Sequence, residues 1–148
     1  WLAKHLILVD SGIEHVSGEM HTAVWEKFKQ GDSKVEEGLL LLRTAAKKMA
    51  EGLNRDRRDA VVESLKQVCK GVDLIDENIH APFKSVINPL IDNKHLMAWK
   101  AVGAGGGGCA ILLVRPSAQD VVKQACLDGG WSIIEWGFDD VGLVIENQ

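Results

Sequence analysis

Two long stretches of the chain repeat apolar residues at helical spacing. In the first stretch the apolar positions are Val35, Leu39, Leu42, Ala46, Met49 and Leu53. In the second they are Val61, Leu65, Val68, Val72 and Ile75. Steps of three and four residues place each set on one side of an α-helix. Because only a few residues separate the stretches, we expect an antiparallel helix pair whose apolar sides face a core.

Polar residues and glycines mark the ends of these two helices. Ser33, with Glu36 three residues later, fits a capping box at the start of the first helix. Gly52 and Asn54 mark its end, and the second helix is expected to start near Asp56. The charged residues on the other sides of both helices are interpreted as solvent-facing.

Shorter helices are predicted elsewhere. The segment 18–30 repeats apolar residues every four positions, and 118–127 follows Ser117 and Asp120, which fit a helix cap. Two prolines divide 80–95 into short pieces, so this segment carries no clear prediction.

Five segments have the apolar runs of β-strands. The first, at 5–9 ("HLILV"), is closed by the turn sequence "DSG". Strands are also predicted at 98–102 and 109–114, on either side of a glycine cluster. The last two, at 131–138 and 142–146, surround a turn of two aspartates.

The order of these elements predicts the fold class. One strand, several helices, two strands, a helix and two more strands indicate an antiparallel sheet built from hairpins. We expect an α+β domain with two layers, in which about four antiparallel strands carry helices on one face. The whole chain, 1–148, is interpreted as a single domain without repeats or low-complexity tails.

Composition narrows the function classes. The 148 residues carry a formal net charge of −4 and no run of Lys or Arg, which argues against a nucleic-acid partner. No apolar run is long enough to span a bilayer, so no membrane partner is expected. Three widely spaced cysteines, Cys69, Cys109 and Cys126, form no CxxC pair and indicate a reducing compartment. Because no signal-peptide pattern opens the chain either, we expect a cytoplasmic location.

The least ordinary stretch is Lys100–Val114, "KAVGAGGGGCAILLV", in which five of the six residues 103–108 are glycine. A dinucleotide-binding loop would be followed by a helix, and a Walker loop by Lys-Ser or Lys-Thr, but a strand-like run starting at Cys109 follows here. A protein-kinase loop would need HRD and DFG motifs downstream, which this chain lacks. Two interpretations remain: a loop whose backbone N–H groups face an anion, and a hairpin in which backbone packs closely on backbone.

The same stretch resembles the third conserved motif of the GHMP kinases, the small-molecule kinases named for galacto-, homoserine, mevalonate and phosphomevalonate kinase. "HLILVDSGIEHVSG" is similar to the strand and turn that open the C-terminal domain in the sugar-kinase branch, including galactokinase-like and arabinokinase-like members. "NPLID" and the paired helices look more like heptose-phosphate kinases. The resemblance covers nearly the whole chain, although the segment between "NPLID" and Lys100 is shorter than in heptose kinases.

This resemblance implies the C-terminal, ferredoxin-like domain of an ATP-dependent sugar or sugar-phosphate kinase. The family's main phosphate loop, its catalytic residue and most nucleotide contacts lie in an N-terminal domain, and none of those motifs occurs here. The resemblance therefore implies an N-terminal GHMP kinase domain as partner, ATP and Mg²⁺ as cofactors of the parent enzyme, and no cofactor or activity for this chain alone. The alternative is a stand-alone, non-catalytic binding or regulatory domain. The sequence leaves open which sugar is used and whether the chain forms a homo-oligomer.

The resemblance also implies site residues. The loop next to the phosphates corresponds to Gly103, Ala104, Gly105, Gly106, Gly107 and Gly108. Residues expected on the substrate side are Asp10, Ser11, Gly12 and His15, although ordinary turn chemistry explains Asp10 and Ser11 equally well. No catalytic residue is assigned to this chain.

Two other residue groups have side chains that can carry a function. His15, Glu19 and His21 do not have the spacing of an HExxH motif, so no metal site is predicted. Trp99 and Trp131 lie in predicted strands and are interpreted, with Trp136, as core or interface residues.

Overall fold

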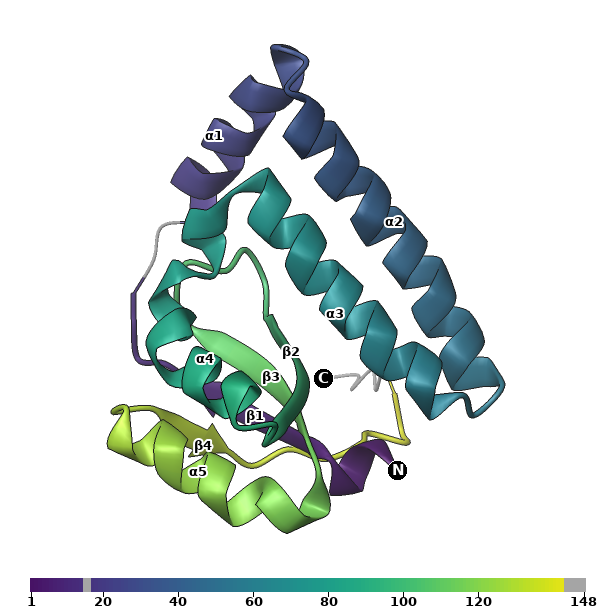
Figure 1. The fold of residues 1–148 in the computed structure, drawn as a ribbon, viewed down its shortest axis with the longest axis vertical. Coiled ribbons are helices and arrows are strands. Elements are labelled where there is room, and N and C mark those ends of the chain that lie inside the picture. The colour runs from purple at the N-terminus through teal and green to yellow at the C-terminus, as the bar shows by residue number, and fades with distance from the viewer. Residues whose placement is uncertain (15–16, 143–148) are drawn as a thin grey trace, which may run out of the picture.

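A four-stranded antiparallel sheet forms the centre of the molecule (Figure 1). The structure is a computed structural model, and it describes residues 1–14 and 17–142. The strands are β1 (Leu6–Asp10), β2 (Leu96–Ala101), β3 (Cys109–Val114) and β4 (Ser132–Ile134), in the order β2-β3-β1-β4. Every neighbouring pair is antiparallel, and β3 pairs with β1 through the register Leu6 to Leu113. The expected α+β class is confirmed.

The part of the chain that the structure describes contains five α-helices, which pack against this sheet and against one another (Figure 1). They are α1 (Ser17–Lys29), α2 (Ser33–Asn54), α3 (Arg58–Ile75), α4 (Lys84–Asp92) and α5 (Gln119–Asp128). Single 3₁₀ turns lie at Leu2–Lys4 before β1, at Glu77–Ile79 and Ala81–Phe83 between α3 and α4, and at Pro116–Ala118 before α5. The predicted helices at 18–30 and 118–127 and the predicted helix pair are all present.

The main core lies between one face of the sheet and helices α4 and α5. Alternating β3 residues such as Leu112 and Val114 point into it, as the two-residue period of a strand requires. Ile87 of α4 and Val122 of α5 pack against them, and all four side chains are fully buried. Trp99 and Trp131 also lie in this core, which confirms their interpretation.

The α2–α3 pair packs beside β2 through a smaller cluster. Leu65 of α3 contacts Ala98 and Leu113 there. The two helices approach closely where Gly38 faces Gly71: a Cβ placed on Gly38 would lie 2.6 Å from the Gly71 carbonyl oxygen. The missing side chains therefore set the distance between the helices.

Three local predictions were wrong. The N-cap of α2 is Asp32, whose Oδ1 accepts the N–H groups of Lys34 at 2.8 Å and Val35 at 3.3 Å, so Ser33 is the first helical residue and not the cap. Ser117 does not cap α5, because the Pro116–Ala118 turn runs directly into that helix.

The third correction concerns the last predicted hairpin. Within 131–138 only Ser132–Ile134 pairs as a strand, and residues 135–142 pair with no strand in the described part of the chain. Asp139 does form a turn, since its Oδ1 accepts the N–H of Val141 at 2.9 Å. All but the first residue of the predicted strand 142–146 lies outside the described residues.

Candidate functional site

The glycine loop, residues 103–108, connects β2 to β3 with an unusual backbone. Gly103, Gly105, Gly106 and Gly108 have φ values between 66° and 79°. Residues with a Cβ rarely adopt this left-handed region, so the glycines are needed for the path of the chain.

Two other backbone segments hold this loop in place. The N–H of Gly106 donates to the Ile79 carbonyl oxygen at 2.8 Å, and the N–H of Gly108 donates to the Ile13 carbonyl oxygen at 2.9 Å. A Cβ on Gly105 would lie 2.3 Å from Ile79 Cγ2, and one on Gly107 would lie 2.3 Å from the Ile13 oxygen. Close backbone packing therefore explains the glycines at these positions, and two of the loop's amides are already bonded to the protein.

The turn after β1 is bonded to the same loop. Both the N–H and the Oγ of Ser11 donate to the Gly108 carbonyl oxygen, at 2.9 Å and 2.8 Å. Asp10 instead accepts the N–H of Gly12 at 2.9 Å, which is ordinary turn chemistry. The structure thus brings Ser11 against the glycine loop, while His15 lies outside the described residues.

A cavity of about 240 Å³, called here the loop pocket, opens beside the start of this loop. It lies between α1, the α2–α3 pair, the turn at Ile79 and the first loop residues. Its apolar walls are Val24, Leu39, Leu42, Val72, Ile75 and Ile79. Its polar lining consists of His21, His80 and Lys100.

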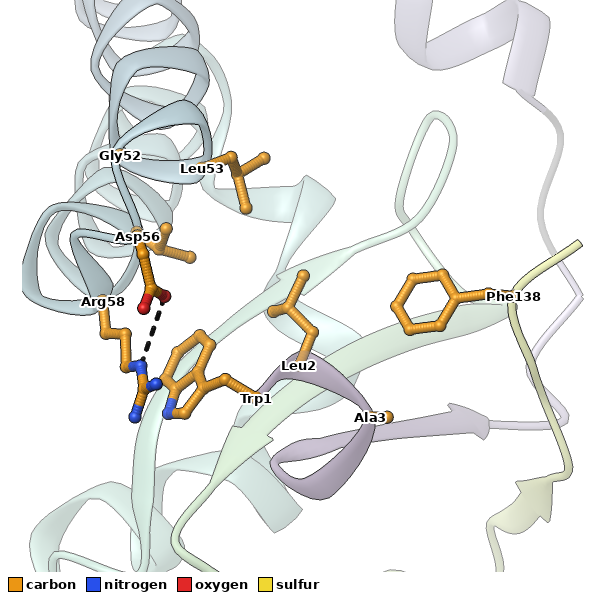
Figure 2. Close-up of a pocket in the computed structure, with 9 residues that line it drawn as sticks. Trp1, Leu2, Ala3, Gly52, Leu53, Asp56, Arg58 and Phe138 are labelled. Atoms are coloured by element: carbon orange, nitrogen blue, oxygen red, sulfur yellow. Dashed lines mark hydrogen bonds and ion pairs between the residues drawn. The ribbon is translucent and has the colours of Figure 1, made fainter. Parts of the chain in front are cut away.

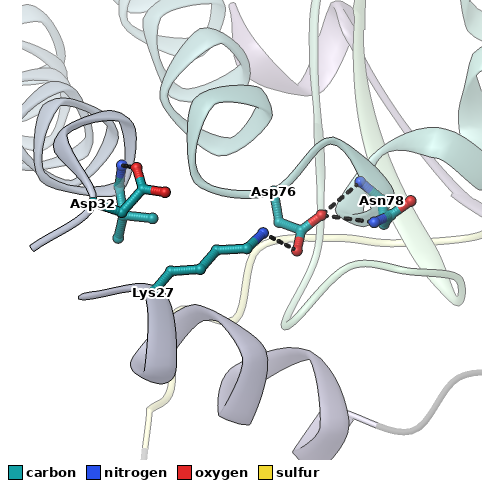
Figure 3. Close-up of polar contacts among 5 residues, drawn as sticks. Lys27, Asp32, Asp76 and Asn78 are labelled. Atoms are coloured by element: carbon teal, nitrogen blue, oxygen red, sulfur yellow. Dashed lines mark hydrogen bonds and ion pairs between the residues drawn. The ribbon is translucent and has the colours of Figure 1, made fainter. Parts of the chain in front are cut away.

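An ion pair connects α1 to the end of α3. Lys27 Nζ lies 3.0 Å from Asp76 Oδ2, directly after α3 (Figure 3). The other carboxylate oxygen of Asp76 accepts both the backbone and the side-chain N–H groups of Asn78, at 3.0 Å and 2.9 Å. These hydrogen bonds lower the pKa of Asp76, against the opposing effect of its partial burial, so the pair is charged at neutral pH.

His80 is the most deeply buried polar side chain of the pocket, at 1% exposure. Its Nδ1 lies 3.2 Å from Asp73 Oδ1, and its ring centroid is 4.5 Å from that of Trp99. Burial lowers the pKa of His80, and Asp73 opposes that shift only in part. The imidazole is therefore neutral at pH 7, and it helps to fix the turn that carries Ile79.

Lys100 is half-buried at the end of β2, where its Nζ donates to the Ala101 carbonyl oxygen at 2.7 Å. Burial lowers the pKa of this ammonium group. The nearby thiol of Cys69 donates to the Trp99 carbonyl oxygen at 2.8 Å, and burial raises its pKa to about 12. Cys69 is consequently a protonated, structural cysteine and no nucleophile.

Sequence reasoning missed His80 and the role of Ile79. The spacing between histidines gives no signal for His80, because its partner Asp73 lies across the end of α3. In the sequence, Lys100 stands out only as the first residue of the glycine motif. The sequence did contain a signal that Lys100 lines a cavity. It is a lone lysine in an apolar strand, and such a side chain must either reach solvent or line a cavity.

Within 1–14 and 17–142, no group of three or more His, Cys, Asp or Glu side chains is placed to hold a metal ion. In the same ranges, no helix combines the length and the apolar character needed to cross a membrane.

A second pocket lies at the other end of the α2–α3 pair, where α2 turns into α3 (Figure 2). Trp1, Leu2, Leu53 and Phe138 surround it, and Arg58 lies above the Trp1 ring, 5.9 Å from its centroid. Figure 2 also shows the pairing of Arg58 with Asp56, at 3.4 Å. This pocket shares no residue with the glycine loop.

Comparison with known proteins gives a clear result for the fold alone. No protein-family model and no curated protein sequence matches the chain. A solved structure of the Lin0012 protein from Listeria innocua superposes with a TM-score of 0.72 at 16% identity, over 88% of this chain. The structure of L. major mevalonate kinase in complex with R-mevalonate superposes with a TM-score of 0.63, also at 16% identity, over 84% of this chain.

The chain has a fold consistent with that of a GHMP kinase C-terminal domain. It spans 38% of the length of each of these two proteins. The fold implied by the sequence resemblance is thus confirmed.

Proposed function

We propose that this chain is the C-terminal domain of an ATP-dependent GHMP-type kinase that phosphorylates a sugar or a sugar phosphate. The observation that carries the proposal is the glycine loop: its backbone is fixed between Ile13 and Ile79, in a domain whose fold resembles part of a mevalonate kinase. Such a fixed loop suits a reaction that depends on positioning and charge stabilisation more than on covalent chemistry.

The loop's contribution in that enzyme would be to shape the wall of the active site. Because Gly106 and Gly108 donate to protein carbonyls, the loop amides that remain for a phosphate are those of Gly103, Ala104, Gly105 and Gly107. For these four, no acceptor is found among residues 1–14 and 17–142. Mg²⁺ and ATP, when bound, would supply the divalent charge and the phosphoryl group, held largely by an N-terminal domain. Ser11 would keep the loop aligned with the turn after β1.

The test is a coupled ATP-consumption assay on the natural full-length protein and on the 148-residue chain, with galactose, arabinose, fucose and heptose phosphates as acceptors. We expect turnover with one acceptor class for a protein that carries an N-terminal phosphate loop, and none for the chain alone. A natural protein without that loop, and without turnover on any acceptor, would support the stand-alone binding domain instead. Turnover by the chain alone, retained through repurification, would show that the chemistry lies elsewhere.

A further inference from the structure

We propose that the loop pocket binds a small amphipathic anion, with an apolar body between the helices and an acidic group on the ammonium of Lys100. The proposal goes beyond the kinase function and does not depend on it, because every group it uses lies on this chain.

The walls of the pocket set the size and polarity of the ligand. Six aliphatic side chains from α1, α2, α3 and the Ile79 turn line a volume of about 240 Å³. This volume is just below the range of roughly 300–1,000 Å³ that is common for drug-sized ligands. The pocket therefore fits a short alkyl or branched body and excludes a nucleotide or a large sugar.

Lys100 supplies the charge at the polar side of the pocket. An ammonium group has three donors, and only one hydrogen bond, to the Ala101 carbonyl oxygen, engages it. No carboxylate of the described residues forms an ion pair with it. Burial lowers the pKa of Lys100, which means that part of its hydration is lost without compensation by an opposite charge.

The carboxylates of Asp73 and Asp76 are already engaged with other side chains. Asp73 lies between His80 and Lys84, at 3.2 Å and 3.5 Å. Asp76 pairs with Lys27, as Figure 3 shows. The remaining polar lining, His21 and His80, contributes no negative charge. An anion is thus the ligand that compensates the pocket's charge, whereas a cation would be repelled.

The ligand would also contact the glycine loop. Gly103 and Ala104 line the same pocket as Lys100. A bound molecule would therefore rest against the first loop residues and couple occupancy of the pocket to the position of the loop.

The experiment titrates the 148-residue chain with four probes of equal chain length: hexanoate, hexyl phosphate, hexanol and hexylammonium. Methyl NMR shifts of Val72, Ile75 and Leu42 report binding in the pocket. We expect saturable shifts with at least one of the two anions, at least about tenfold tighter than with hexanol, and the weakest binding with hexylammonium. The two anionic probes distinguish a carboxylate ligand from a phosphate ligand.

Matched variants separate charge from packing. Lys100→Met should abolish the advantage of the anions over hexanol, and Lys100→Arg should retain it. Lys66→Met removes the same charge from an exposed site on α3 and should change nothing. Val72→Phe should fill the pocket and weaken all probes.

Three results would overturn the proposal. They are equal binding of hexanol and the anions to the unmodified chain, unchanged anion binding in Lys100→Met, and an absence of shifts at the pocket methyls. The first and third results are measured on the unmodified chain, so they can refute the proposal even if a variant fails to fold.

Discussion

At the scale of single residues, Gly103 and Gly105 have nearly the same backbone conformation in different surroundings. Their φ values are 73° and 75°. A Cβ on Gly103 would meet no atom within 4 Å, whereas one on Gly105 would overlap Ile79. Comparing the two positions therefore separates backbone strain from close packing.

We predict that Gly105→Ala destabilises the chain by about 2–4 kcal/mol, the sum of left-handed strain and overlap with Ile79. Gly103→Ala should cost only the strain, about 1–2 kcal/mol. Urea unfolding of both variants measures the difference. Equal losses in the two would mean that the Ile79 turn moves aside freely, so the loop is not held there.

The buried imidazole of His80 predicts a pH dependence of stability. Its pKa in the folded chain lies below the ordinary value of about 6.5, because burial and the charges of Lys84 and Lys100 outweigh Asp73. The unfolded chain therefore takes up a proton first as the pH falls, and stability decreases below about pH 6.5. Above about pH 6.5, His80 is neutral in both the folded and the unfolded chain, so its contribution to the free energy of unfolding no longer changes with pH.

We expect His80→Gln to flatten the stability curve between about pH 7 and pH 5, even where it lowers stability overall. His95→Gln, at a half-buried site before β2, is the control. The measurement is the melting temperature of both variants and of the unmodified chain between about pH 7 and pH 5. If the stability of His80→Gln changed with pH in parallel with that of the unmodified chain, a group other than His80 would cause the loss of stability at low pH.

At the scale of elements, the apolar spacing placed α2 and α3 correctly as helices, and the α3 stripe faces the interior, where Val61, Leu65 and Ile75 are buried. The predicted α2 stripe was wrong in part. Leu39, Ala46 and Leu53 are exposed, and the buried side of α2 is formed instead by Val35, Gly38, Ala45 and Gly52, because small residues let the two helices approach closely.

The cap of α2 was misassigned because Asp32 and Ser33 both have capping side chains, and spacing to Glu36 favoured the wrong one. α4 was missed because Pro89 stands inside it. Pro89 is the sixth residue of α4 and removes one intrahelical hydrogen bond, but the burial of Ile87 and Leu90 in the core stabilises the helix nevertheless.

Asp32→Ala should therefore cost about 0.5–2 kcal/mol of stability, since it removes the acceptor for two amides of α2. Ser33→Ala, one residue later, should stay within about 0.5 kcal/mol of the unmodified chain. Chemical unfolding of both proteins compares the two assignments directly. If Ser33→Ala lowered the free energy of unfolding more than Asp32→Ala, Ser33 and not Asp32 would be the cap of α2.

The crossing of α2 and α3 gives a second prediction at this scale. Alanine normally stabilises a helix by about 1 kcal/mol relative to glycine. Gly38→Ala should nevertheless cause a net loss of at least about 1 kcal/mol, because the new methyl group would overlap the Gly71 carbonyl oxygen.

The control for this crossing is Gly18→Ala in α1, where no atom lies within 4 Å of the new Cβ. It should leave the melting temperature unchanged or raise it. If Gly38→Ala were equally harmless, the two helices would have room to separate.

At the scale of the whole molecule, the order of strands and helices was enough to predict the layers of the fold. The candidate site could be predicted only in part. The glycine loop stands out in the sequence, but its partners Ile13 and Ile79 are ordinary apolar residues with no visible signal. They act through backbone carbonyl groups, which every residue has. The loop pocket likewise depends on how α1 lies relative to the α2–α3 pair, and no local sequence pattern encodes that arrangement.

The hydrogen bonds donated by the Gly106 and Gly108 amides join segments that are far apart in the chain. Hydrogen exchange at these two amides therefore reports whether the segments stay together. The amide protons of Gly106 and Gly108 are shielded only while the turn after β1, the turn after α3 and the β2–β3 connection stay together. We expect these two protons to exchange with deuterated solvent as slowly as those of the central strand β3, although they belong to a loop. The amide of the exposed Gly12, bonded only to the Asp10 side chain, should exchange within the dead time of the experiment. Fast exchange at Gly106 with slow exchange at Gly108 would mean that the Ile79 turn opens by itself, and would thus measure how independently that part of the molecule moves.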